Sequence, residues 1–161
     1  MNLEPNTNIN FYQNLGKLFY AIAAVDKTVK EKEFNTLETI IRNDWFLEKN
    51  ILKNFNQKKV DTILNTFKWL QNDNEYSAEA CYNSFINFNK THKSLFNKDI
   101  NSQILKTANH IAASFSKKNK SELIILAKLN LELNKQNVKL TYKLNCSTNG
   151  IHRLLQSIRY F

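Results

Sequence analysis

A short motif occurs twice in this chain, once near each end. Ile22-Ala23-Ala24 is followed by Glu33, and Ile111-Ala112-Ala113 is followed by Glu122 at the same offset. In each copy, small residues end one helical pattern, a short polar stretch follows, and the glutamate belongs to a second pattern. Repetition at a fixed offset is typical of a duplicated helix-loop-helix unit. Two such units can bury together the apolar faces that neither buries by itself.

The remaining sequence also favours helices. The 161 residues suit one domain, and they include only two glycines and one proline. So few chain breakers are unusual in a protein built from many short strands and tight turns. The predicted fold class is therefore all-α, a single helical bundle of about seven helices with two pseudo-repeated helix-loop-helix units.

Apolar residues at helical spacing locate the predicted helices. The segments are 10–25, a helix that follows Thr28 and ends at Asp44-Trp45, a short helix at 51–55, then 60–70, 81–88, 100–115 and 123–133, with a loop at 89–98. Thr28 with Glu31, and Asn119 with Glu122, have the spacing of a capping box at a helix start. Segment 123–133 is apolar nearly all round, so we expect it at the buried centre of the domain.

The two ends of the chain have different patterns. Residues 1–9 are polar and are expected to form a flexible arm before a helical domain at 10–136. In the C-terminal extension, 137–161, apolar and polar residues alternate between Val138 and Leu144, which predicts a strand-like arm. A short amphipathic helix is expected at 151–158. A strand there could pair with a second chain.

Positive charge is concentrated in the second half of the chain. The formal net charge is +9, and from Lys90 onward only Asp99, Glu122 and Glu132 oppose the lysines and arginines. Lys117, Lys118 and Lys120 form a basic patch in the second copy of the motif. Such a field attracts nucleic acid or an anionic membrane surface. A solvated basic surface without a ligand is the alternative.

Several classes of site are not supported by the sequence. No histidines or cysteines have zinc-ligand spacing, and no glycine-rich loop could bind phosphate. Cys81 and Cys146 are expected to be reduced thiols. We expect no catalytic residues, no enzyme activity and no small-molecule substrate. No apolar run is long enough to span a membrane, and Glu4 and Lys17 argue against a signal peptide. A cytoplasmic protein is predicted, with membrane association as an open alternative.

Trp69 is a candidate contact for a protein partner. It lies between Phe67 and Leu70 but off the apolar stripe of its segment. We therefore expect the indole to be exposed, and exposed tryptophans are frequent at the centres of protein interfaces.

The first copy of the motif resembles a known family. Residues 15–26, with Val29 and Glu33, are similar to the tellurite-resistance TerB-like domain, in which an alanine-rich helix end precedes an aspartate-containing loop and a glutamate in the next helix. The resemblance implies an all-helical domain of two related halves. It also implies a non-enzymatic role in stress response, membrane-linked complexes, and divalent-metal binding by acidic residues.

By motif position, the implied metal ligands are Asp26, Glu33 and Glu122. Lys27 replaces the glycine that follows the aspartate in the family, and Phe115 occupies the second aspartate position. The expected cofactor is therefore none, or a weakly bound divalent cation, because a hard cation such as calcium takes six to eight oxygens. The alternative is that these acidic side chains cap helices.

Overall fold

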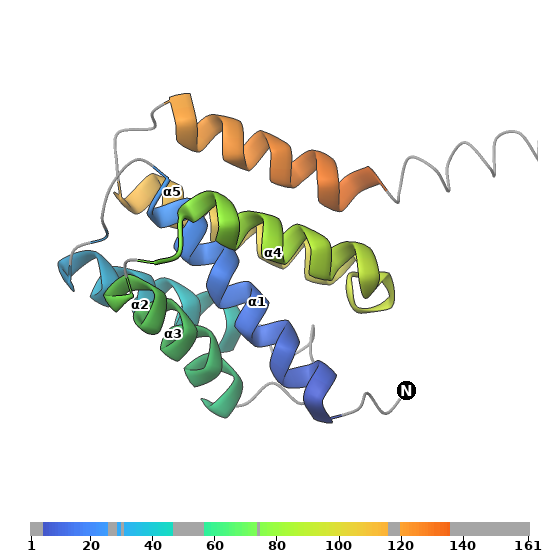
Figure 1. Ribbon diagram of the computed structural model, residues 1–161, viewed down its shortest axis with the longest axis horizontal. Coiled ribbons are helices and arrows are strands. Elements are labelled where there is room, and N and C mark those ends of the chain that lie inside the picture. Colours follow the sequence, from blue (N-terminus) through green and yellow to red (C-terminus); the bar gives the residue numbers. More distant parts are fainter. Residues whose placement is uncertain are drawn as a thin grey trace, which may run out of the picture.

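The computed structural model describes residues 5–25, 29, 31–46, 57–73, 75–115 and 120–135. All regular secondary structure within these residues is helical (Figure 1), so the predicted all-α bundle is confirmed. The predicted helix at 51–55, strand at 138–144 and helix at 151–158 lie outside the described residues.

Helix α1, Pro5–Ala23, occupies the centre of the bundle. It packs against α3, α4 and α5, and Leu15, Leu18 and Phe19 on it are fully buried. The helix begins earlier than the sequence predicted, so residues 5–9 are helical and the expectation of a flexible arm is wrong for them. Proline favours this start because its fixed φ suits the first turn, where the missing N–H is not needed.

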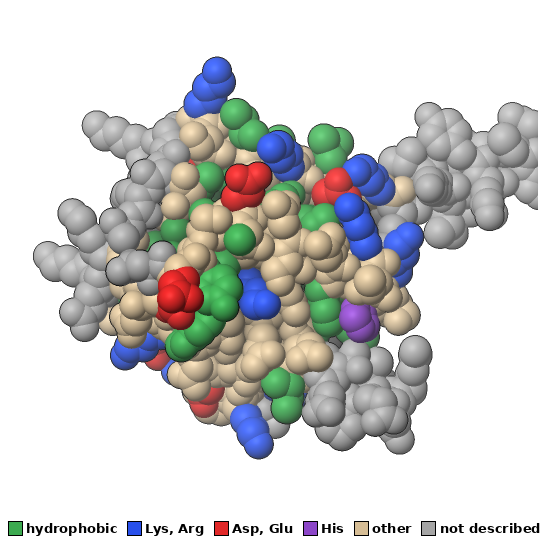
Figure 2. Space-filling model, in the orientation of Figure 1, with side chains coloured by type: hydrophobic (Ala, Val, Ile, Leu, Met, Phe, Trp, Pro, Cys, Tyr) green, Lys and Arg blue, Asp and Glu red, His purple; other side chains and the backbone are tan. Residues whose placement is uncertain are grey.

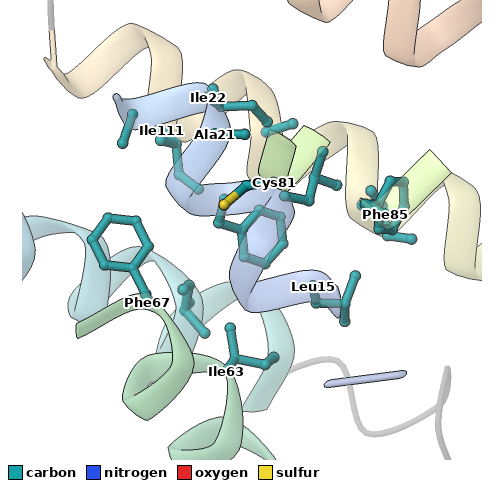
Figure 3. Close-up of a cluster of buried hydrophobic side chains, with 14 of the residues drawn as sticks. Leu15, Ala21, Ile22, Ile63, Phe67, Cys81, Phe85 and Ile111 are labelled. Carbon is teal, nitrogen blue, oxygen red and sulfur yellow. The ribbon is translucent and has the colours of Figure 1, made fainter. Parts of the chain in front are cut away.

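Gly16 explains how closely α1 and α3 approach. A Cβ atom at this position would lie 2.7 Å from the carbonyl oxygen of Ile63 and 2.8 Å from Cβ of Thr66. Only glycine leaves room for the α3 backbone here. Figure 3 shows the core around this contact, where Leu15 of α1 and Ile63 and Phe67 of α3 belong to one buried apolar cluster.

Helices α2, Glu31–Phe46, and α3, Gln57–Asn72, follow the predicted apolar stripes. α2 begins at the predicted capping glutamate and packs against α5 and α3. The five predicted apolar positions of α3 are all buried, namely Val60, Ile63, Leu64, Phe67 and Leu70. Leu37 and Ile41 of α2 are fully buried as well.

Helix α4, Ala78–Thr91, is longer than predicted because the Ser77 side chain caps its first turn, accepting a hydrogen bond of 3.1 Å from the Ala80 N–H. The predicted loop at 89–98 is instead partly helical. It contains the short 3-10 helix η1, Lys93–Leu95, and α5, Lys98–Phe115, begins at its end. Asn97 caps α5 by accepting a hydrogen bond of 2.8 Å from the Ile100 N–H.

A last helix covers residues 120–135, and we call it helix 120–135. It runs antiparallel to α5, because Asn101 near the start of α5 donates a hydrogen bond of 3.0 Å to the carbonyl of Leu133 near its end. Ile125, Leu129 and Leu133 face the core. The prediction that this helix is buried at the centre of the domain is wrong, since Leu123, Ile124 and Leu131 are exposed.

The two Ile-Ala-Ala copies lie in one core. Ile22 on α1 and Ile111 on α5 are both buried in the same apolar cluster (Figure 3), and α1 packs against α5. α1 and α2 also meet where the rings of Phe19 and Trp45 lie 6.4 Å apart. The arrangement brings both copies to a shared interior, and the ancestral duplication itself stays a prediction.

Candidate functional site

The predicted metal ligands divide between described and undescribed residues. Asp26 and the side chain of Glu33 lie outside the described residues, so the three-residue site stays a prediction. Glu122 is buried on the inner face of helix 120–135, with 3% of its surface exposed. Within the described ranges, no group of three or more histidine, cysteine, aspartate or glutamate side chains could hold a metal ion.

Two further predicted surface features can be located in part. Lys120 is exposed at the start of helix 120–135, while Lys117 and Lys118 lie outside the described residues. Trp69 is exposed, which agrees with its position off the apolar stripe of α3. Its ring packs on the half-exposed ring of Tyr76, with centroids 5.2 Å apart and planes tilted by 50°. This aromatic pair lies where α3 leads into α4.

A buried polar cluster joins the end of α2 to α5. The Asp44 side chain is only 7% exposed. Its Oδ2 accepts a hydrogen bond of 3.0 Å from the Thr107 hydroxyl and lies 2.9 Å from Nδ1 of His110. Nζ of Lys106 is 3.8 Å from Oδ1. A buried carboxylate is tolerated only when it is paired and hydrogen-bonded, and Asp44 meets that requirement.

The same cluster completes the end of α2. The Gln103 side chain donates to the carbonyl oxygen of Asp44, one of the terminal carbonyls that the helix itself leaves unpaired. Gln103, Thr107 and His110 recur at helical spacing along one face of α5. A polar stripe at that spacing was visible in the sequence, but its partner Asp44 is far away along the chain. Because the Thr107 hydroxyl donates its hydrogen to Asp44, the cluster links α2 to α5 through buried hydrogen bonds.

Cys81 lies in the core where α4 crosses α1 (Figure 3). Burial raises the pKa of its thiol, and the nearby Lys17 ammonium opposes that change. The thiol is therefore protonated at neutral pH and has little nucleophilic character. Cys146 lies outside the described residues.

A groove of about 840 Å³ separates α4 from helix 120–135. Apolar and polar side chains from both helices line it. The residues that α4 contributes are Ala78, Glu79, Tyr82, Asn83, Ile86 and Lys90. Those that helix 120–135 contributes include Ile124, Ile125, Lys128, Leu131, Glu132 and Lys135. Over these two helices, Figure 2 shows apolar side chains beside lysine and acidic ones on the molecular surface.

Exposed apolar side chains line one wall of this groove. Leu131 is 66% exposed and Ile124 is 45% exposed, and both line the groove from helix 120–135. Leu123 on the same helix is 52% exposed but does not line the groove. The apolar pattern of 123–133 predicted that all these residues are buried, so the groove could not be predicted from it. Their spacing alone does not show which face of the helix is covered.

Some polar groups of the groove have partners among the described residues, and others do not. Lys135 pairs with Glu132 on the same helix. Lys90 and Lys128 lie on opposite walls, and neither forms a salt bridge with another described residue. The buried hydroxyl of Tyr82 has no hydrogen-bond partner among the described residues. Burial and the nearby Glu132 carboxylate raise the pKa of this hydroxyl to about 12.

Comparisons of the chain with protein-family models, with curated proteins and with solved structures find no significant match. In the described part of the chain, no helix is both long and apolar enough to cross a bilayer.

Proposed function

We propose that this chain is a non-enzymatic, TerB-like adaptor module that docks a protein partner in the groove between α4 and helix 120–135. The observation that carries the proposal is the exposure of Leu131 and Ile124 along one wall of that groove. Fully burying a leucine or isoleucine side chain stabilises an interface by about 1.5–3 kcal/mol. Contiguous apolar surface with a polar rim is typical of protein interaction sites.

The geometry of the polar clusters supports a docking role over catalysis. The carboxylate of Asp44 is fully engaged by α5, and the hydroxyl of Thr107 donates into it. Activation of a hydroxyl nucleophile needs a base that accepts its proton next to a space for substrate. The groove, by contrast, is open, and both apolar and charged side chains line its walls.

Site-specific photocrosslinking in the cells that make the protein tests this function. A photoreactive phenylalanine analogue replaces Leu131 in the groove or, as a control, Ser102 on the exposed surface of α5. A discrete crosslinked protein that forms from position 131 and not from position 102 is expected. The recovered protein should then bind the purified chain directly. Equal crosslinking from both positions, or none from position 131, would contradict the proposal.

The stress-response role and any metal site are also part of this proposal, because both come from the family resemblance of residues 15–34. A cation held by Asp26, Glu33 and Glu122 would raise the melting temperature in millimolar calcium or zinc. The Asp26→Ala variant should lose that increase. An unchanged melting temperature in the original chain would remove the metal site and leave the docking function to the crosslinking test.

A further inference from the structure

We infer that the groove binds an amphipathic helix of a partner protein whose flanks carry acidic residues. This inference rests on the proposed docking function and specifies the chemistry of the partner. The lining of the groove extends along α4 from Ala78 to Lys90, a rise of about 18 Å at 1.5 Å per residue. A partner helix of about twelve residues has the same length. Helices in such grooves bind through apolar anchors at helical spacing.

Charge selects the flanks of that partner helix. Lys90 projects from one wall and Lys128 from the other, and neither ammonium is paired with a described carboxylate. Glu79, the other charged residue that α4 contributes to the groove, belongs to the first turn of the helix. It lies about 16 Å along the helix axis from Lys90, which is too far for the two side chains to pair. An occupant with glutamates on both flanks can therefore pair with both lysines while its apolar side chains contact Leu131, Ile124 and Ile86. A basic helix would meet like charges on both walls.

A second copy of this chain is a poorer occupant. A symmetric dimer uses the same surface on both subunits. If helix 120–135 packed antiparallel on its own copy about the helix midpoint, Lys120 would face Lys135, and Lys128 would lie close to its symmetry mate. Like charges placed together across an interface cost several kcal/mol. In this arrangement, pairing of the exposed apolar side chains Leu123, Ile124 and Leu131 would bring lysines together.

An anionic membrane surface also fits the groove less well. A flat bilayer surface can contact the exposed Leu123 and Leu131 but does not fill a concave groove whose lining includes Ile86, Tyr82 and Ile125. Membrane association should therefore depend on Leu123 as much as on Leu131. A docked helix depends on Leu131, because Leu123 lies outside the groove lining.

The test uses the full chain and labelled amphipathic peptides of about fourteen residues. One peptide has leucines at helical spacing with glutamate flanks, and the other has the same leucines with lysine flanks. Fluorescence anisotropy should show binding of the glutamate peptide. Leu131→Glu should weaken that binding by about thirtyfold, and Leu123→Glu, the matched control on the same helix, should change it less than twofold.

Charge reversal separates specific pairing from general attraction. Lys128→Glu should weaken binding of the glutamate peptide by about fivefold and improve binding of the lysine peptide. Lys93→Glu, a charge reversal at an exposed η1 residue outside the groove lining, should have a smaller effect on both. Equal affinity for the two peptides, or equal losses from Lys128→Glu and Lys93→Glu, would overturn the inference.

The same variants also test whether a membrane or a second copy of the chain occupies the groove instead. Binding of the chain to vesicles containing phosphatidylserine that is lost equally in Leu123→Glu and Leu131→Glu would replace the acidic helix with a membrane. Dimers that sediment as such at micromolar concentration and are broken by Leu131→Glu would replace it with a second copy. If position 131 crosslinks to a protein in cells but the glutamate peptide does not bind, the docking function stands and this inference fails.

Discussion

The indole Nε1 of Trp45 donates a hydrogen bond of 3.0 Å to the hydroxyl oxygen of Thr107 in the buried interface between α2 and α5. Thr107 in turn donates to the Asp44 carboxylate, so one hydroxyl serves as acceptor and donor to neighbouring residues of α2. Apolar packing alone would let α2 slide along α5. This polar pair fixes the register of the two helices, because a shift in register would leave buried polar groups unpaired.

Thr107→Val should destabilise the fold by about 1–3 kcal/mol. The substitution keeps the shape of the side chain but removes both the acceptor for the Trp45 indole and the donor to Asp44. Urea unfolding measures the change in the free energy of unfolding. Thr39→Val is the matched control, because the hydroxyl of Thr39 is exposed and, within the described part of the chain, bonds only to the Asn35 carbonyl of its own helix. Equal losses in the two variants would contradict the register role.

Gly16→Ala should destabilise the fold by about 1–3 kcal/mol, although alanine is usually the better residue inside a helix. The added methyl group would lie 2.7 Å from the backbone carbonyl oxygen of Ile63, and backbone cannot rotate away as a side chain can. Thr66→Ala removes only the 3.1 Å contact with Cγ2 of Thr66 and leaves the contacts with the Ile63 carbonyl oxygen and with Cβ of residue 66, so it should restore little of the loss. Thermal unfolding measures both variants.

The control for this pair is Gln13→Ala, an exposed position on the same helix. It should leave the melting temperature nearly unchanged. A Gly16→Ala variant as stable as the original chain would show that α1 and α3 do not approach as closely as described.

Tyr82→Phe should reduce the loss of stability at alkaline pH. The pKa of Tyr82 is raised to about 12 in the folded chain by burial and by the Glu132 carboxylate. Between pH about 10 and 12 the unfolded chain therefore releases this proton while the folded chain retains it. Stability is fully present below pH 10 and falls by up to about 1.4 kcal/mol per pH unit above it.

Urea unfolding across this pH window measures the slope, and absorbance of tyrosinate follows the titration. Part of the slope should remain in Tyr82→Phe, because burial also raises the pKa of Tyr12 and Tyr20. At neutral pH the variant should be as stable as the original chain or more stable, since the hydroxyl has no partner among the described residues. A loss at neutral pH would indicate a hydrogen bond to that hydroxyl.

The two tryptophans should report different environments. Trp45 is 3% exposed and Trp69 is 51% exposed. The Trp69→Phe variant, in which only Trp45 emits, should have a blue-shifted emission maximum and weak quenching by iodide. Its melting temperature should stay close to that of the original chain, because the lost contact with Tyr76 is on the surface. Quenching equal to that of the original chain would place Trp45 in solvent.

The helices themselves were largely predictable because their signals are local. The apolar stripe of α3 was read from spacing alone, and all five of its predicted positions are buried. The exposure of Trp69 followed from the same periodicity, because its position lies between the stripe residues. Boundaries were less accurate at α4, where the cap is supplied by Ser77 outside the apolar pattern.

Sequence periodicity alone therefore determined that the chain forms helices and which face of most helices is apolar, because those properties depend on neighbours a few positions away. Only the tertiary structure decided that Asp44 is buried against Thr107 and His110, since those partners lie on another helix. It also decided that Leu131 and Ile124 remain exposed beside a groove. Whether an apolar face is covered depends on which distant segments pack against it, and helical spacing holds no information about that packing.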